Sequence, residues 1–268
     1  MIDSINYEGG GGHAIAFAPS KLRYNKFGGP ILSSYEIEEI SRELLLNHCP
    51  HVLRKPCAIP VAEIIKKLYE RTGMLFAKED LGYIGTAKVL GKVSFHKKTL
   101  FLDHCLFGER EAAFQFTVAH EIGHWILHRY NYKNWKFNTR HSAMGGLWDD
   151  DNTMSMLEDR AQIGWLEYQA NVFAASLITP REMFIAAVRQ IQIQIGITKN
   201  IGRIYLSEHA YSRRDYEAII NQLSLIFRVS KKSAYIRTKT LKLTEGDDLV
   251  RNESDTRNPF TVFRSTLN

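Results

Sequence analysis

The sequence of 268 residues is 44% hydrophobic, which is enough for a substantial core in one domain or one and a half. Its net charge of +6 suits an acidic or nucleic-acid partner, but a surplus of this size is ordinary and does not decide between function classes. Three cysteines without a CxxC pair exclude a disulfide framework, and no apolar run approaches the ~20 residues of a membrane span. We therefore expect a cytoplasmic protein without a secretory signal.

Residues 1–30 form a glycine-rich lead-in that we expect to be flexible. The run Gly9–Gly12 is not a phosphate-binding loop, because no Gly-Lys-Ser/Thr follows it and no strand precedes it. Ser33 and Glu36 then form a capping box at the start of a helix with apolar residues at helical spacing. A second helix is predicted from Pro60 to a stop at Gly73.

Residues 74–103 change to short runs of alternating or β-branched residues, broken by glycines and a Lys-Lys pair. The predicted strands cover residues 74–77, 83–90, 92–95 and 99–102. We expect a small antiparallel sheet just before the next helix, with an edge strand that can align an extended peptide.

The stretch Phe114–His128 contains an HExxH sequence inside an apolar helical face. His120 and His124 are four residues apart, so their imidazoles stand on the same side of a helix and can share one metal ion, at roughly 2.0–2.1 Å if it is zinc. Glu121 is rotated about 100° from His120 and can act as general base on a water at that ion. Gly123 costs about 1 kcal/mol in a helix, and we interpret it as keeping the space beside the metal open.

A bland alternative makes both histidines core residues, each with its own hydrogen-bond partner. A zinc site needs a third protein ligand as well as a position for water. His128 lies where a straight helix diverges from the ion, so we interpret it as a favourable charge at the helix C-terminus. Glu167 on a downstream helix is the better candidate, with an exposed rim position as its alternative. Asn171 could hold the second nitrogen of a ligand histidine.

The runs FTVAHEIGHWILH and EYQANVFAASLITP together resemble the ImmA/IrrE family of bacterial metallopeptidases, over about residues 59–243. That family shows Phe-Thr-x-Ala before HExxH, Leu-His after it, and later a glutamate preceding Ala-Asn-x-Phe-Ala and a proline. The resemblance implies a gluzincin-type endopeptidase with zinc held by His120, His124 and Glu167, manganese being the alternative ion, and with Glu121 as catalytic base. It also implies a protein substrate, a helix-turn-helix repressor that is cleaved to induce genes during stress.

Glu167 lies 43 positions after His124, which leaves room for a long, polar insertion at residues 129–159. Its three consecutive aspartates, Asp149–Asp151, are more typical of a solvated loop than of a metal cluster. The groups that could steady an oxyanion, among which the sequence does not choose, are Tyr130, Tyr132, Arg140, His141 and Tyr168.

Another helix is predicted after Thr179-Pro180, with Thr179 as N-cap. Helices are then predicted from Asp215 and over Lys231–Thr240, the latter capped by Ser230, in an arrangement that resembles the carboxy-terminal part of the same family. A packing role is favoured for this pair of helices. In the DNA-binding alternative the phosphate contacts would come from Lys231, Lys232, Arg237 and Lys239.

The sequence thus predicts an α+β, zincin-like fold, with a small antiparallel sheet over an HExxH active-site helix and a helical C-terminal part. Its divisions are residues 1–30, a metallopeptidase domain at 31–190, a helix-turn-helix-like part at 191–243 and a polar tail at 244–268. The predicted function is zinc-dependent cleavage of a peptide bond in a specific protein. The alternatives are a regulator that binds DNA or a repressor without cutting it, and a zinc-dependent hydrolase of a small amide.

Overall fold

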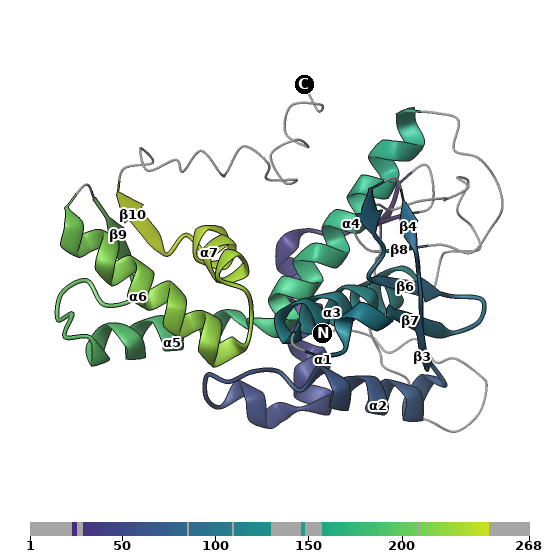
Figure 1. Cartoon of the computed structure of the whole chain (residues 1–268), viewed down its shortest axis with the longest axis horizontal. Coiled ribbons are helices and arrows are strands. Elements are labelled where there is room, and N and C mark those ends of the chain that lie inside the picture. The colour runs from purple at the N-terminus through teal and green to yellow at the C-terminus, as the bar shows by residue number, and fades with distance from the viewer. Residues whose placement is uncertain are drawn as a thin grey trace.

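The computed structural model describes residues 23–25, 29–84, 86–108, 110–129, 146–147, 157–207 and 209–246. The described chain is α+β and mostly helical. One part holds helices α1–α4 and the larger sheet, and beside it lies a smaller part built from α5, α6, α7 and two short strands (Figure 1). No helix in the described part of the chain is both long and apolar enough to cross a membrane.

The first helices follow their capping signals. Two short antiparallel strands of two residues each, β1 (Arg23–Tyr24) and β2 (Pro30–Ile31), precede α1 (Ser34–His48). The predicted capping box between Ser33 and Glu36 is present at the start of α1. A short 3-10 helix, η1 (Pro50–Leu53), follows. Helix α2 (Val61–Thr72) then ends at Gly73 in the left-handed region, with φ of 68°, a conformation that favours glycine.

The larger sheet is mixed. Its order is β3 (Leu75–Glu79), β7 (Thr99–Asp103), β6 (Gly91–Ser94) and β8 (Gly146–Leu147). The antiparallel prediction holds for the β6–β7 hairpin but is wrong for β3–β7, which is parallel. Strand β8, which was not predicted, adds to β6 in parallel. Within the predicted strand 83–90, β4 (Tyr83–Ile84) pairs with β5 (Ala87–Lys88) in a separate antiparallel pair. Because β3 and β7 are parallel, the chain between them makes a crossover connection rather than a tight turn.

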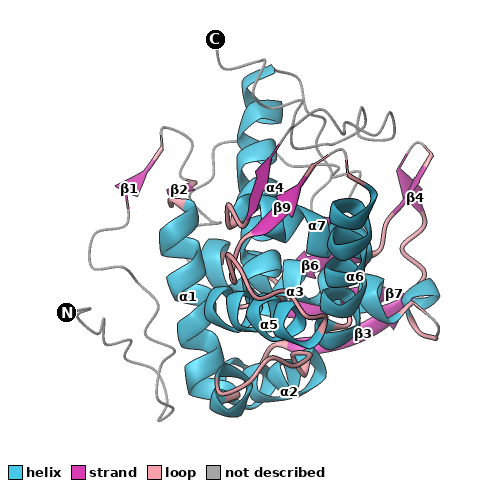
Figure 2. Ribbon diagram, turned by 90° about the vertical axis from the view of Figure 1, so that its left-hand side faces the viewer, coloured by secondary structure: helices cyan, strands magenta, loops and turns pink. Residues whose placement is uncertain are grey.

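Two long helices form the centre of the larger part. Helix α3 (Glu111–His128) begins after the 3-10 helix η2 (His104–Leu106), and α4 (Leu157–Ile178) packs along it. Figure 2 shows the sheet strands on one side of α3 and α1 on the other. Thirteen residues of α3 are buried, which agrees with the apolar face that the sequence shows on this stretch.

The smaller part contains α5 (Arg181–Gln194), α6 (Ala210–Phe227) and α7 (Lys231–Thr240), together with β9 (Ile204–Leu206) and β10 (Thr244–Gly246). Helix α7 has its predicted bounds, and the Ser230 hydroxyl accepts from the Ser233 amide as its N-cap. Pro180 rather than Thr179 is the N-cap residue of α5. The parallel pair of β9 with β10 was not predicted and fixes the chain as far as Gly246.

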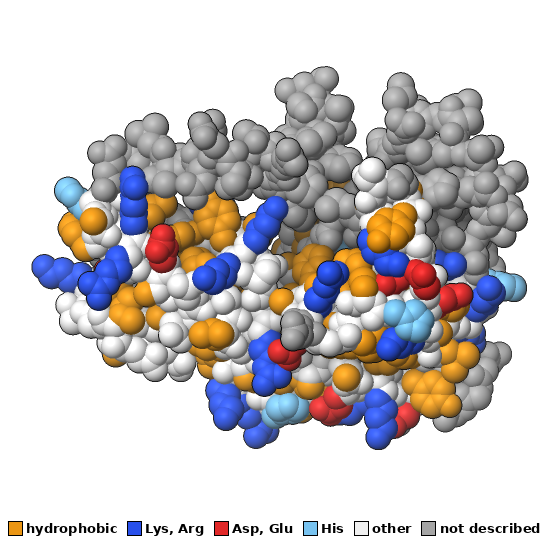
Figure 3. Space-filling view, in the orientation of Figure 1, with side chains coloured by type: hydrophobic (Ala, Val, Ile, Leu, Met, Phe, Trp, Pro, Cys, Tyr) orange, Lys and Arg blue, Asp and Glu red, His pale blue; other side chains and the backbone are white. Residues whose placement is uncertain are grey.

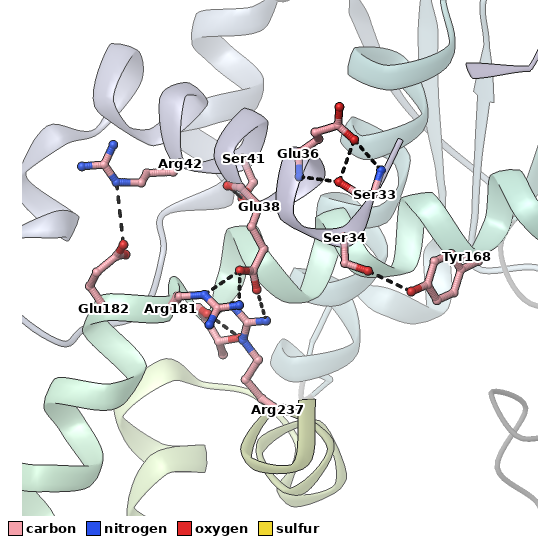
Figure 4. A network of polar contacts seen from close by, with 11 residues as sticks. Ser33, Ser34, Glu36, Glu38, Ser41, Arg42, Tyr168, Arg181, Glu182 and Arg237 are labelled. Carbon is pink, nitrogen blue, oxygen red and sulfur yellow. Dashed lines mark hydrogen bonds and ion pairs between the residues drawn. The ribbon is translucent and has the colours of Figure 1, made fainter. Parts of the chain in front are cut away.

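A partly buried ion network joins the two parts. Arg237 of α7 donates to Glu38 of α1 at 2.6 Å and to the carbonyl of Thr179 at 3.1 Å, and Arg181 of α5 donates to the other oxygen of Glu38 (Figure 4). Arg237 is only 3% exposed. The hypothesis that it contacts nucleic-acid phosphates is therefore wrong, because its guanidinium serves the contact between α7, α1 and the start of α5.

His48 at the end of α1 predicts a pH dependence of stability. Its side chain is 1% exposed, and burial together with the charges of Arg71 and Lys67 lowers its pKa to about 4. The unfolded chain binds this proton below pH ~6.5, so the folded state loses up to about 1.4 kcal/mol per pH unit as the pH falls from there towards 4. His48→Leu should flatten this part of the profile.

The measurement is the free energy of unfolding in urea between pH 4 and 7, compared between wild type and variant. His96→Gln, which removes an exposed histidine from the β6–β7 turn, controls for loss of a histidine as such. Parallel profiles for wild type and His48→Leu would contradict the buried, neutral state of His48.

Candidate metal centre

Helix α3 presents its two motif histidines to the same point. The Nε2 atoms of His120 and His124 lie 3.0 Å apart, as expected for residues one turn apart on one helical face. Both side chains are buried. Two Nε2 atoms that face each other at this distance can bind one metal ion together. This arrangement is not expected for two unrelated core histidines, each with its own hydrogen-bond partner.

Glu167 of α4 completes a group of three donors. Its Oε2 lies 3.1 Å from Nε2 of His120, and its Oε1 lies 3.4 Å from Nε2 of His124. The three ligand atoms all lie within 4.8 Å of one another. Ligands at roughly 2.0–2.1 Å from a tetrahedral zinc ion are about 3.4 Å apart, so the donor set and its spacing fit such an ion.

The electrostatics of the group favour the protonation states that metal ligands need. Burial lowers the pKa of His124 to about 4, which keeps the imidazole neutral near pH 7. Burial alone would raise the pKa of Glu167, but the adjacent rings of His124 and His120 lower it on balance, so the carboxyl stays ionised. Neutral imidazole and carboxylate are the forms that bind zinc.

Glu121 is placed beside this group and is not part of it. Its side chain is fully buried, and neither carboxylate oxygen has a hydrogen-bond partner among the described residues. Burial, and then the charge of Glu167, raises its pKa well above the usual range for a carboxyl. An unpaired buried carboxylate costs stability, so the position points to a chemical role.

Gly91 at the start of β6 leaves the room that the Glu121 carboxylate occupies. A Cβ at this glycine would lie 2.8 Å from Oε1 of Glu121 and 2.7 Å from the Thr117 methyl. The sheet therefore covers α3 closely at Glu121. In the sequence Gly91 is one of the glycines that break the predicted strands, and nothing local shows which residue it approaches.

Gly91→Ala should therefore impair the site without removing a ligand. The methyl group pushes the Glu121 carboxylate by a fraction of an ångström or more, and a misplacement of about 1 Å can cost ~10²-fold in rate. We expect at least a ~10-fold loss of any activity that depends on Glu121, while zinc affinity and α3–α4 packing persist. Turnover and zinc affinity are measured on the same preparation, and full activity in the variant would remove Gly91 from this role.

Gly123 has a different role from the one that the sequence suggested. A Cβ there would meet the Phe173 ring at 3.0 Å, and Phe173 is fully buried on α4. The interpretation that Gly123 keeps space open beside a metal is therefore wrong. The missing side chain lets α3 and α4 approach closely enough for Glu167 to reach the histidines.

The Nδ1 atoms of the two histidines, which face away from the candidate metal position, each contact an outer partner. Asn171 Oδ1 contacts Nδ1 of His120 at 3.1 Å, in the outer position that its spacing from Glu167 suggested. Nδ1 of His128 contacts Nδ1 of His124 at 2.9 Å, so the interpretation of His128 as a helix-end charge misses its main contact. Gln169, which the sequence analysis did not single out, contacts Nε2 of His128 at 3.0 Å.

The remaining predicted site residues do not join this group. Tyr130, Tyr132, Arg140, His141 and the aspartates Asp149–Asp151 lie outside the described residues. Tyr168 is described, and its hydroxyl lies 3.0 Å from the Ser34 hydroxyl at the start of α1 (Figure 4). In this conformation Tyr168 serves the contact between α1 and α4 rather than the three donors.

Comparisons with known proteins give a family and a distant likeness to solved structures. The model of the Peptidase_M78 family, described as the IrrE N-terminal-like domain, matches residues 70–239. Among curated proteins nothing matches. A solved structure of a Mycobacterium tuberculosis transcriptional regulator is similar at 14% identity and a TM-score of 0.44, over 76% of this chain. This chain spans 46% of that protein.

Proposed function

The chain belongs to the Peptidase_M78 family, whose domain is IrrE N-terminal-like, and on that premise we propose that it is a zinc-dependent endopeptidase that cuts one specific protein. The observation that carries the proposal is the meeting of three metal-binding side chains with a buried glutamate that has no hydrogen-bond partner in the described part of the chain. Membership of a metallopeptidase family implies a metal but leaves its identity and the reaction to be tested.

In this proposal His120, His124 and Glu167 hold zinc, with manganese as the alternative ion. Zinc supplies a Lewis acid for the peptide carbonyl and lowers the pKa of water towards ~7. The chain contributes a preformed set of donors, since Glu167 already lies 3.1 Å and 3.4 Å from the two Nε2 atoms. Asn171 holds the His120 ring from behind, which fixes its orientation.

Glu121 acts as the general base. It accepts a proton from the attacking water and returns it to the leaving amine, so the peptide nitrogen departs as a neutral amine. Its buried position, and then the charge of Glu167, raise the pKa of the carboxyl above its usual range, which makes the carboxylate a stronger base. Gly91 on the covering strand provides the space for this carboxylate.

The same proposal assigns a zincin-like arrangement to the larger part, with the sheet over α3 aligning an extended peptide across the site. In this proposal the metallopeptidase domain corresponds to the larger part, and α5–α7 with β9 and β10 form the helical C-terminal part. The boundary between residues 190 and 191 that the sequence suggested falls inside α5, and β10 extends the C-terminal part to Gly246. The close approach of β6 to Glu121 supports this placement of the sheet.

The proposed substrate is a helix-turn-helix transcriptional repressor in the cytoplasm, cut to induce gene expression under stress. The support is the likeness of both motif runs to the ImmA/IrrE family. The test incubates the purified chain, loaded with zinc, with the repressor encoded beside its gene. A discrete cut that a chelator abolishes and added zinc restores supports the proposal, and an intact repressor under all conditions contradicts it.

A non-proteolytic regulator is the second candidate, and one observation favours it. Residues 180–246 hold 12 Lys and Arg against 5 Asp and Glu, whereas residues 1–179 are balanced at 20 of each. Figure 3 shows mainly Lys and Arg among the charged side chains on the visible face of the α5–α7 part. Such a surface suits nucleic acid or an acidic partner. A catalytically dead Glu121→Gln variant that still induces the target genes in cells would favour this candidate.

A further inference from the structure

Three hydrogen bonds lead from the back of one candidate ligand to a backbone carbonyl in the N-terminal segment. Nδ1 of His124 contacts Nδ1 of His128 at 2.9 Å, and Nε2 of His128 contacts Oε1 of Gln169 at 3.0 Å. Nε2 of Gln169 then donates to the carbonyl oxygen of Pro30 at 2.8 Å. All three side chains are buried. We refer to these four residues as the relay.

The direction of the relay follows from its last atom. The Pro30 carbonyl can only accept, so the amide of Gln169 must turn its NH₂ towards Pro30 and its oxygen towards His128. An amide oxygen also only accepts, so Nε2 of His128 carries a proton. Complete burial favours a neutral imidazole, which has a single N–H, and Nδ1 of His128 is therefore an acceptor.

The consequence reaches the ligand. Because Nδ1 of His128 accepts, Nδ1 of His124 must donate, and the Nε2 lone pair of His124 is left free on the side that faces His120 and Glu167. His120 is held in the same tautomer by a single partner: its Nδ1 donates to Oδ1 of Asn171, so its Nε2 is also unprotonated. The two imidazoles thus offer bare Nε2 atoms to one point through two independent outer partners.

The fixed end of the relay lies far away in the sequence. Pro30 belongs to β2 and is 139 residues from Gln169, and its carbonyl also accepts from Nε1 of Trp165 at 3.3 Å. Two side chains of α4 therefore hold the backbone of β2 in place. This makes the docking of β2 on α4 part of the support of the metal centre.

We propose that His128 and Gln169 are positioning residues that, anchored on the Pro30 carbonyl, hold the proton of His124 on Nδ1 and so keep its Nε2 ready for the metal. The proposal rests on the metal centre of the proposed function but not on the substrate. Substitution of an outer partner of this kind typically reduces metal affinity 10–100-fold. It also makes β2 a structural requirement for full metal affinity, although β2 supplies no ligand.

The first test measures zinc affinity by competition with a chromophoric chelator in shape-conserving variants of the full chain. His128→Phe and Gln169→Met should each weaken zinc binding 10–100-fold. His128→Gln, which offers an acceptor and a donor, should recover most of the affinity. Gln192→Met is the matched control, because Gln192 is an equally buried glutamine that bridges Gly202 and Arg203 in the smaller part. It should leave zinc affinity unchanged.

The second test needs neither metal nor activity. Nitrogen NMR of the metal-free wild type reports which ring nitrogen of His124 carries the proton, and we expect Nδ1. In Gln169→Met this preference should be lost. A proton on Nε2 of His124 in the wild type, or wild-type zinc affinity in both His128→Phe and Gln169→Met, would overturn the proposal. If variants fail to fold, the wild-type spectrum still decides.

These outcomes separate the relay from the proposed function. A wild-type chain that binds zinc with the expected variant pattern but cuts no repressor would refute the proposed peptidase and leave the relay standing. If the wild type cuts its repressor while both variants keep full zinc affinity, the relay is refuted and the proposed peptidase stands.

Discussion

Glu121→Gln should leave zinc bound while cleavage of the repressor falls by at least ~10²-fold, which is the usual contribution of a general base. Glutamine keeps the size of the side chain and removes only its ability to take a proton. The three ligands are untouched, so the variant should bind zinc as tightly as the wild type. Zinc content by elemental analysis and single-turnover cleavage are the two measurements.

The same substitution has a second readout. The Glu121 carboxylate is buried, and within the described residues it has no hydrogen-bond partner, so it burdens the folded state. Replacing it with a neutral amide should leave the melting temperature of the metal-free chain equal or higher, as is common when a functional group is removed. Glu111→Gln is the control and should change neither measurement. Glu111 is an exposed glutamate in the first turn of the same helix, and it pairs with Arg228. Unchanged turnover in Glu121→Gln would exclude the general-base role.

Glu167→Ala should reduce zinc affinity by more than the 10–100-fold that an outer partner carries, because it removes one of three protein ligands. Its loss leaves two histidines on one helix, which cannot enclose the ion. It also removes the charge that helps to raise the pKa of Glu121. Chelator competition measures the affinity directly.

Glu217→Ala, an exposed glutamate on α6, is the control for removing a carboxylate, and its zinc affinity should match the wild type. If Glu167→Ala instead retained wild-type zinc content, the third ligand would lie elsewhere, and the donor set of α3 and α4 would have to be reassigned.

Local signals predicted the elements well. Ser33 with Glu36 and Ser230 before α7 are side-chain caps that need only their immediate neighbours, and both helices begin where those residues indicate. The spacing of His120 and His124 likewise fixes their common face without any knowledge of the fold. The sequence is less reliable where a local contact depends on the exact helix geometry: it misses the contact of His128 with His124 one turn away, and it indicates Thr179 rather than Pro180 as the N-cap of α5.

Contacts between elements could not be read in this way. Gly123 lies against Phe173 and Arg237 lies in an ion pair with Glu38, and no periodicity in either segment reveals the partner. His128 has the position of a helix-end charge, but the packing of α4 supplies Gln169 and changes its role. The parallel pairing of β3 with β7 depends in the same way on the path of the whole chain.

The contact of Glu38 with Arg181 and Arg237 has a consequence for how the chain folds. Glu38 and Arg237 are 199 residues apart, so their pairing closes a loop that includes nearly the entire folded chain. Glu38 also pairs with Arg181, so it is removal of Glu38 that leaves Arg237 as an uncompensated buried charge, which typically costs about 3–5 kcal/mol. This ion pair connects α1, the first helix, to α7, the last helix in the described part of the chain, so α1 can make the contact only after α7 has been synthesised.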